Sequence, residues 1–329
     1  MNERHKVVLD SDLGIDDAMA LYFALAHPAI ELLGISTTFG DVSVAQAARN
    51  ALYLCALAGR RLPVTEGVNT PTRKQPLPPD PEIHGEDGLG NLPDRPTHTP
   101  PPDERTSARF IVEMAHAHPG DLTLVALGPL GNLSQALRLE PRLTELLKQV
   151  IVMGGTVTEP GNVSPVAESN IWHDPHAADH IFTAGFKLTM VGLDVTHRMH
   201  MPLALFERIA ARHQHPATDT LLHAVRFYVN FYGQQQAELA QAQACFGHDL
   251  LAMIHLVRPD LFSTEEGRVR VVTEGLAQGQ TILDRRPAIA YPQAGWGEDI
   301  PLSRVSLQVD AAACLELFEY TLLQDWLTT

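Results

Sequence analysis

Short apolar runs alternate along the chain with segments of helical periodicity. The runs are rich in Val, Ile and Leu and read as buried strands at residues 7–9, 30–36, 122–126, 150–153 and 187–191. Apolar side chains recur at helical spacing between them, over residues 44–58, 107–116 and 175–184. Alternation of strands and helices predicts a mostly parallel sheet with helices on both faces, which is an α/β fold.

The pattern changes at three places. Residues 63–102 hold eleven of the 24 prolines and show no helical period, which predicts a long loop at about 67–105. Two helices are expected over 202–213 and from 218 to about 242. Residues 268–272, 279–284 and 305–310 have the period of two that is typical of strands. We expect one domain over 1–329, with a central sheet flanked by helices and a small C-terminal β extension.

Composition and charge argue against some classes of partner. The formal net charge of -15, without a cluster of Lys or Arg, argues against a nucleic-acid partner. Cys55, Cys245 and Cys314 lack C-x-x-C spacing, which favours a reducing compartment. No apolar run is long enough to span a membrane, and residues 1–6 show no export signal, so we expect a cytoplasmic protein without a membrane partner.

Four carboxylates follow the first strand directly, at Asp10, Asp12, Asp16 and Asp17. This places them at the carboxyl end of a strand, where open α/β sheets bind ligands. Their mutual repulsion would be offset by a divalent cation, and an oxygen-only ligand set favours calcium or magnesium. The alternative is structural: Asp16 occupies the expected N-cap of the next helix, and Asp10 and Asp12 would be turn residues.

A second polar group comprises Asn162, Glu168 and Asn170, which lie within nine residues of one another. These side chains offer more hydrogen bonds than a strand connection needs, and the vicinal hydroxyls of a sugar are suitable partners. In the alternative interpretation the two asparagines are turn residues and Glu168 is solvated.

Several motifs together resemble one family. Residues 10–18 resemble the D-x-D-P-G-x-D-D-A signature of the nucleoside hydrolases, the calcium-dependent N-ribohydrolases of the inosine-uridine-preferring type, with Leu13 in place of Pro. Further segments resemble that family's I-H-G-x-x-G-L, G-N-x-x-P-x-A-E-x-N, G-L-D-x-T and H-D-P-L-A motifs, at residues 83–89, 161–170, 192–196 and 248–252. The resemblance covers essentially the whole chain, with a Rossmann-like central sheet, and implies hydrolysis of ribonucleosides to ribose and free base.

The resemblance also implies a role for individual residues. Calcium would be held by Asp12, Asp17, Asp249 and the carbonyl of Leu127, with Asp12 as the base that activates water. His248 would be the acid for the leaving base. The substrate, a small-molecule nucleoside, would contact Asp16, Asp41, His84, Met153, Asn162, Glu168, Asn170, Tyr228, Tyr232 and Asp249. Family members are usually homodimers or homotetramers.

Some of these residues have structural alternatives. Tyr228 and Tyr232 lie four apart on one helix face and could be core packing instead of a lid over the base. His84 could lie in a surface turn. For Asp194 and His197 we expect a structural role, holding neighbouring loops by hydrogen bonds.

Asp41 is the difference from the family motif that bears most on function. The family has Asn at this position, and an ionised Asp cannot donate a hydrogen bond. The chain could therefore be restricted to a modified nucleoside, or be a weakly active ribose-binding homologue. From another class, Asp10-Ser11-Asp12 also resembles the D-x-D of magnesium-dependent phosphatases, in which the first Asp attacks phosphate.

Overall fold

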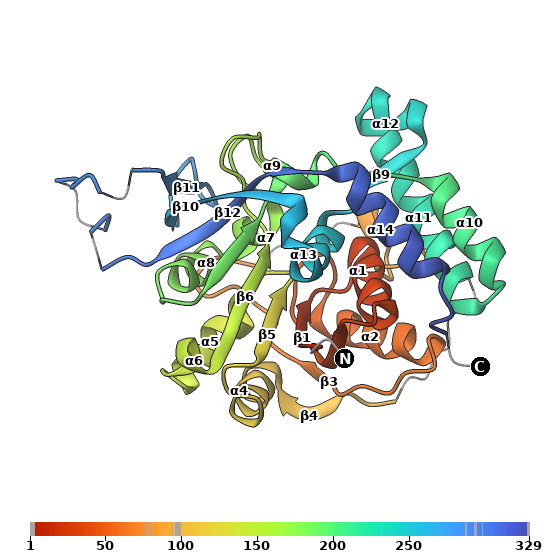
Figure 1. The fold of residues 1–329 in the computed structure, drawn as a ribbon, viewed down its shortest axis with the longest axis horizontal. Helices are drawn as coiled ribbons and strands as arrows, with labels where there is room; N and C mark the ends of the chain where they lie inside the picture. The colour runs from red at the N-terminus through yellow and green to blue at the C-terminus, as the bar shows by residue number, and fades with distance from the viewer. Residues whose placement is uncertain are drawn as a thin grey trace.

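A ten-stranded sheet in the order β11-β10-β12-β7-β6-β5-β1-β2-β3-β4 forms the centre of the molecule (Figure 1). The computed structural model describes residues 4–76, 78–79, 81–93, 95, 100–286, 288–292, 295–297 and 299–327. The strands of this sheet are β1 His5–Ser11, β2 Ile30–Thr37, β3 Val64–Glu66, β4 Asp103–Thr106, β5 Leu122–Ala126, β6 Leu147–Met153, β7 Leu188–Val191, β10 Phe262–Val271, β11 Thr281–Asp284 and β12 Leu302–Val309. A separate two-stranded sheet pairs β8 His200–Pro202 with β9 Ala244–Phe246.

Strand directions confirm the predicted α/β class. Every pairing from β12 through β4 is parallel, whereas β10 is antiparallel to both β11 and β12. The predicted C-terminal strands exist, and they are joined to the main sheet because β12 pairs with β7.

Helices cover both faces of the sheet (Figure 1). Val7 and Leu9 of β1 belong to one hydrophobic core and Val8 belongs to the other, as the alternation of side chains along a strand requires. The first core also contains residues of α1 Ile15–Ala26, α2 Val44–Leu57, α10 Leu203–His213, α11 Pro216–Gln235, α13 His248–Val257 and α14 Ala311–Leu323. The second contains residues of α4 Ser107–Ala117, α5 Gly131–Leu139, α6 Leu143–Leu146 and α8 Pro175–Phe182.

Three local expectations need correction. The N-cap of α1 is Gly14, so Asp16 and Asp17 lie in the first turn of that helix, near its positive end. The helix expected from 218 to about 242 is divided at Gln236, whose extended backbone separates α11 from α12 Ala237–Ala242. The proline-rich stretch contains one short helix, α3 Pro81–His84, which buries His84.

The connection between β1 and β5 creates the crevice in which a site can form. The chain runs outward from β1 through β2, β3 and β4, and then returns to place β5 on the other side of β1. The Leu127 N–H, just after β5, donates to the Asp10 carbonyl at 2.7 Å. Residues that follow these two strands therefore lie side by side at a topological switch point.

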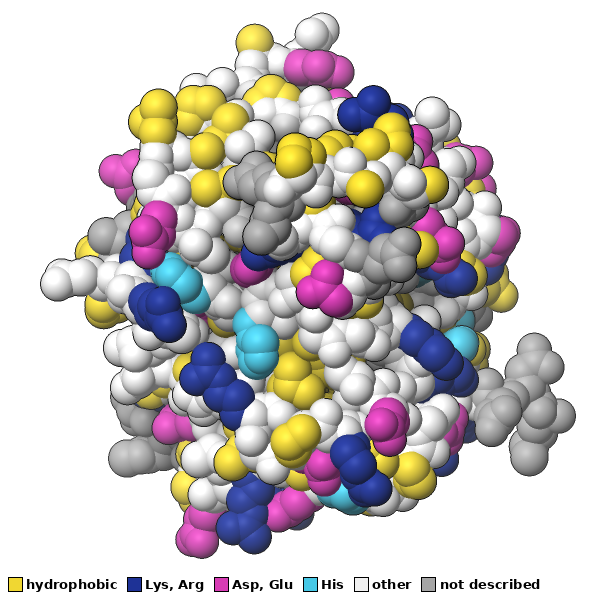
Figure 2. Space-filling view, turned by 90° about the vertical axis from the view of Figure 1, so that its left-hand side faces the viewer, with side chains coloured by type: hydrophobic (Ala, Val, Ile, Leu, Met, Phe, Trp, Pro, Cys, Tyr) yellow, Lys and Arg dark blue, Asp and Glu magenta, His cyan; other side chains and the backbone are white. Residues whose placement is uncertain are grey.

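The surface shows no sign of a membrane-spanning element among the residues described. No described helix is both long and apolar enough to cross a bilayer. On the face that Figure 2 shows, basic and acidic side chains are interspersed and do not gather into a patch of one sign.

Candidate active site

One pocket at the carboxyl end of the parallel strands gathers the residues that the sequence singled out. All the predicted site residues line it except Asp12 and Asp17, which are buried within its floor. The lining side chains come from α1, α3, α7 Ser169–His173, α11, α13, the end of β6 and the loops that follow β2, β5 and β6, namely Asp16, Asp41, Ile83, His84, Leu127, Met153, Asn162, Glu168, Ser169, Asn170, Tyr228, Tyr232, His248 and Asp249.

Buried carboxylates form the floor of the pocket. Asp12, Asp17 and Asp249 are 1%, 0% and 3% exposed. Burial first, and then the charge of neighbouring carboxylates, raises the pKa of Asp17 to about 6 and holds those of Asp12 and Asp249 well above their usual range. The cluster thus carries an electrostatic penalty that a cation would remove.

The donor atoms of this floor fit a hard metal ion. Carboxylate oxygens of two overlapping groups, Asp12 with Asp17 and Asp41 and Asp16 with Asp17 and Asp249, lie within 4.8 Å of one another. Oxygen-only ligands suit calcium or magnesium better than zinc. No Lys or Arg of the described part of the chain lines the pocket to take the place of a cation. The acidic cluster can therefore hold a metal.

Asp12 is fixed in position by the backbone around it. The Asp41 N–H donates to Asp12 Oδ2 at 2.7 Å. A Cβ atom on Gly40 would overlap the same oxygen, and one on Gly128 would lie 2.9 Å from Asp12 Oδ1. Only glycine permits this close approach of two loops to the carboxylate, so both loops set its orientation.

Glu168 organises the opposite wall. Its carboxylate caps α7 Ser169–His173 by accepting from the N–H groups of Asn170 at 2.9 Å and Ile171 at 3.1 Å, and it also accepts from Gly155 N–H at 2.9 Å. Burial raises the pKa of Glu168 to about 7. Asn170 Nδ2 donates to the Leu127 carbonyl at 2.8 Å, which connects this wall to the loop that follows β5.

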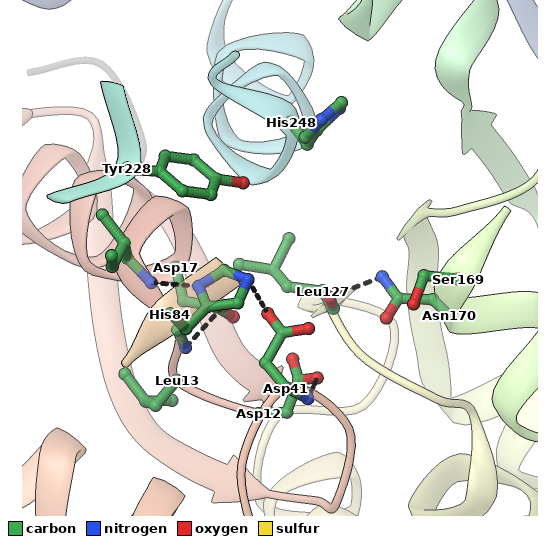
Figure 3. Close-up of polar contacts among 12 residues, drawn as sticks. Asp12, Leu13, Asp17, Asp41, His84, Leu127, Ser169, Asn170, Tyr228 and His248 are labelled. Atoms are coloured by element: carbon green, nitrogen blue, oxygen red, sulfur yellow. Dashed lines mark hydrogen bonds and ion pairs between the residues drawn. The ribbon is translucent and has the colours of Figure 1, made fainter. Parts of the chain in front are cut away.

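His84, Asp41 and Tyr228 occupy one end of the pocket (Figure 3). His84 Nδ1 accepts from the Ile15 N–H at 3.1 Å, and His84 Nε2 lies 3.0 Å from Asp41 Oδ2. Burial lowers the pKa of His84, but Asp41 and neighbouring carboxylates outweigh it and raise that pKa to about 9. Because the Ile15 N–H occupies Nδ1, the proton that faces Asp41 is the one on Nε2.

His248 lies within a chain of hydroxyl groups. Its Nδ1 is 2.7 Å from Thr196 Oγ1 and its Nε2 is 3.1 Å from the Tyr232 hydroxyl, which lies 3.3 Å from the Tyr228 hydroxyl. Burial lowers the pKa of His248 to about 3, so the imidazole is neutral at pH 7. Tyr228 is only 2% exposed, so its ring packs against the protein while its hydroxyl belongs to this chain.

Sequence reasoning missed two supporting residues and interpreted a third correctly. Thr196 is the last residue of the 192–196 motif and contacts His248. Its place in that motif was the one feature of the sequence that could have indicated a supporting role. Asn132 Nδ2 donates to Asp10 Oδ1 at 2.7 Å across 122 residues of chain, which no local pattern reveals. Asp194 is structural as predicted, because it accepts from the N–H groups of Val157 and Thr158.

Asp10 does not suit the phosphatase alternative. It is 0% exposed and does not line the pocket. Its carboxylate accepts from Asn132 and from the Ser36 hydroxyl, so it anchors the loops and is not presented to a substrate.

Comparison with known proteins shows which family this chain resembles. The family model described as inosine-uridine preferring nucleoside hydrolase matches residues 7–316. The probable uridine nucleosidase 2 of Arabidopsis thaliana is 35% identical over 330 residues, covering 98% of this chain and 99% of the relative.

Solved structures agree with the sequence comparison. The plant nucleoside hydrolase PpNRh1 superposes with a TM-score of 0.90 at 33% identity, over 97% of this chain and 99% of that one. The purine-preferring ribonucleoside hydrolase from Gardnerella vaginalis gives 0.86 at 31% identity, over 97% and 98%. The chain therefore belongs to the inosine-uridine preferring nucleoside hydrolase family, whose members hydrolyse the N-glycosidic bond of ribonucleosides.

Proposed function

We propose that this protein is a calcium-dependent ribonucleoside hydrolase, with Asp12, Asp17, Asp249 and the Leu127 carbonyl as ligands of the ion. The observation that supports this most strongly is the juxtaposition of a buried, all-oxygen acidic floor with the Glu168 wall in one pocket. When bound, calcium would supply coordination for the ribose hydroxyls and for one water molecule. Calcium suits this role better than zinc because the ligands are hard oxygens.

Asp12 is proposed as the general base. Its fixed carboxylate takes a proton from the attacking water, whose oxygen adds to C1′ while the C1′–N bond breaks and its electron pair passes to the base. The Tyr228 and Tyr232 hydroxyls, backed by His248, form the route by which a proton reaches a neutral leaving base. His84 lies at the same end of the pocket and contacts the base.

The ribose is proposed to bind between the floor and the Glu168 wall. Asp16, Asn170 and Asp249 would hold the vicinal hydroxyls near the metal ligands, and Asn162 and Glu168 would hold the far side of the sugar beside Met153. Buried polar groups built for a hydroxyl are left without a partner when that hydroxyl is missing. Substrates that lack the 2′-hydroxyl should therefore react poorly.

The identity of the base is a separate proposal. The relatives have names that specify uridine or purine substrates. Either kind of base meets the same tyrosines in this pocket, so both purine and pyrimidine ribonucleosides should be tried.

We also propose a cytoplasmic homodimer or homotetramer, a single domain over 1–329 and a small-molecule substrate. The three buried, free cysteines are consistent with a reducing compartment.

The test is release of reducing sugar from inosine, uridine, cytidine and adenosine and from their 2′-deoxy forms. The proposal predicts one ribose per free base from the ribonucleosides and at least a 100-fold lower kcat/KM for the deoxy forms, about 3 kcal/mol of lost binding to the hydroxyl. Equal rates for both series would contradict the proposed ribose site. Phosphate release from a phosphomonoester without any ribose release would favour the phosphatase alternative.

A further inference from the structure

Asp41 places an additional negative charge in the pocket, at a position where the family motif has an uncharged Asn. Its side chain is 25% exposed, whereas the floor carboxylates are almost completely buried. Its backbone N–H is already used by Asp12, and its Oδ2 is paired with His84. Among the described residues, no side chain donates a hydrogen bond to Asp41 Oδ1, which is therefore available to a ligand.

The orientation of His84 decides what Asp41 presents to the pocket. Because the Ile15 N–H occupies His84 Nδ1, the ring proton lies on Nε2 and is donated to Asp41. An Asn at position 41 would accept this proton with its oxygen and turn its NH2 group toward the ligand. The Asp instead presents a second acceptor oxygen and a full charge, so the hydrogen-bonding polarity of this part of the wall is reversed.

The surroundings of Asp41 indicate which part of a nucleoside it meets. Figure 3 shows Asp41 between His84 on one side and Leu127 with Asn170 on the other, with Tyr228 and His248 across the pocket. If the ribose diol binds at Asp16 and Asp249, the base must extend toward the tyrosines, past Asp41. Among the described residues, no Lys or Arg lines the pocket beside this carboxylate.

We propose that Asp41 makes this site selective for ribonucleosides whose base carries a formal positive charge, such as N-alkylated pyridinium or purine ribonucleosides. This inference rests on the proposed function and narrows its substrate class. A cationic base satisfies Asp41 Oδ1 in a largely desolvated pocket, whereas a neutral base leaves that oxygen without a charged partner. Asp41 is thus a specificity-determining residue.

A cationic base can leave the ribose without receiving a proton. The C1′–N bond breaks and its electron pair returns to the ring nitrogen, which leaves as a neutral heterocycle. The water oxygen forms the new bond to C1′, and the proton it loses goes to Asp12. Since the positive charge disappears from the base as the bond breaks, attraction to Asp41 is strongest in the bound substrate and acts on KM more than on kcat.

The experiment compares the wild-type protein with Asp41→Asn on the 3-carbamoylpyridinium ribonucleoside, inosine and uridine. We expect the wild-type protein to have a lower KM for the pyridinium substrate than for inosine. In Asp41→Asn that KM should rise about 10-fold or more, the effect of losing one charged partner, with a smaller change in kcat. The KM for inosine should stay constant or fall.

Asp121→Asn is the matched control. Asp121 has a similar side-chain exposure, 28%, but it pairs with Lys6 outside the pocket, so Asp121→Asn makes the same change of net charge and disturbs a surface ion pair that is not part of the pocket. An equal shift of KM in both variants, or an unchanged ratio of pyridinium to inosine KM in Asp41→Asn, would overturn the inference. Ribose release from inosine without preference for the cation would refute the inference and leave the proposed function standing. No release from any ribonucleoside would contradict both.

Discussion

Single residues far from the substrate hold the acidic floor in place. Asn132 is fully buried and contacts three strands or loops at once: its Nδ2 donates to Asp10 Oδ1 and to the Thr37 carbonyl at 2.9 Å, and its Oδ1 accepts from Val68 N–H at 2.8 Å. A buried carboxylate without its donors is costly. Asn132 is therefore a stability residue that also fixes the loop after β1.

Asn132→Ala should lower the free energy of unfolding by about 2 to 4 kcal/mol, because Asp10 and the Val68 N–H lose their partner in a dry environment. Urea unfolding followed by circular dichroism measures this. Asn132→Asp serves as the comparison, since it keeps the acceptor for Val68 but adds a charge beside Asp10, and it should be at least as destabilising. A loss below 0.5 kcal/mol, the usual size of surface effects, would show that the network contributes little.

Thr196 acts through His248. In Thr196→Val the hydroxyl that orients Nδ1 is lost while the side-chain shape is kept, so kcat on inosine should fall on the order of 10-fold, with KM nearly constant. Thr196→Ser keeps the hydroxyl and should retain most of the activity. If Thr196→Val and Thr196→Ser reduce kcat equally, the packing of this side chain matters and its hydrogen bond to His248 does not.

At the scale of elements, the strands and most helices were predictable and several of their ends were not. Residues 7–9 are apolar on both faces, which correctly indicated a buried parallel strand, and the carboxylates after it had to gather at its end. The N-cap of α1 was misassigned because Gly14 and Asp16 are both acceptable there, and Asp17 closes onto the Gly14 N–H. The break at Gln236 comes three residues after Gly233, which lies inside α11 and does not mark the end of the helix.

Long-range contacts explain the rest of what the sequence did not show. Asn132 and Thr196 became recognisable only when the fold brought them to Asp10 and His248, over 122 and 52 residues. Ser169, which lines the pocket, hydrogen-bonds with His173 one helical turn further along α7. Motif spacing locates the residues that touch substrate, whereas the residues that hold them depend on tertiary structure.

Helix α13 carries the site at one end and a buried histidine at the other. His255 is 8% exposed and packs against Phe262, with ring centroids 4.9 Å apart. Burial, followed by the charge of Arg304, lowers the pKa of His255 to about 4.

Because the unfolded chain binds this proton near pH 6.5 and the folded protein only near pH 4, stability is lost as pH falls between these values. From pH 7 to pH 4 the loss from His255 should be about 3 kcal/mol. His255→Leu should flatten this part of the stability profile, measured by urea unfolding at pH 7, 6, 5 and 4. The same slope in both proteins would show that His255 stays exposed to solvent or titrates normally.

The whole molecule places its chemistry at one edge of a continuous sheet. A sheet with cores on both faces leaves only the carboxyl ends of the strands for a ligand, and the order β5-β1-β2 opens the crevice there. The same fold recurs in the family members that match this chain over nearly its full length. Within that shared frame, Asp41 adds a partly exposed carboxylate to the pocket.

The most direct test of the account is ribose release from inosine and uridine by chelator-treated protein, with calcium or magnesium then added back. Chelation should abolish release and calcium should restore it, with magnesium less effective because it demands a stricter geometry. In Asp12→Asn calcium should still raise Tm, while ribose release should remain at least 100-fold below wild type, the contribution of a general base. Full activity in the presence of chelator, or in Asp12→Asn, would contradict the central claim that this acidic floor drives the reaction.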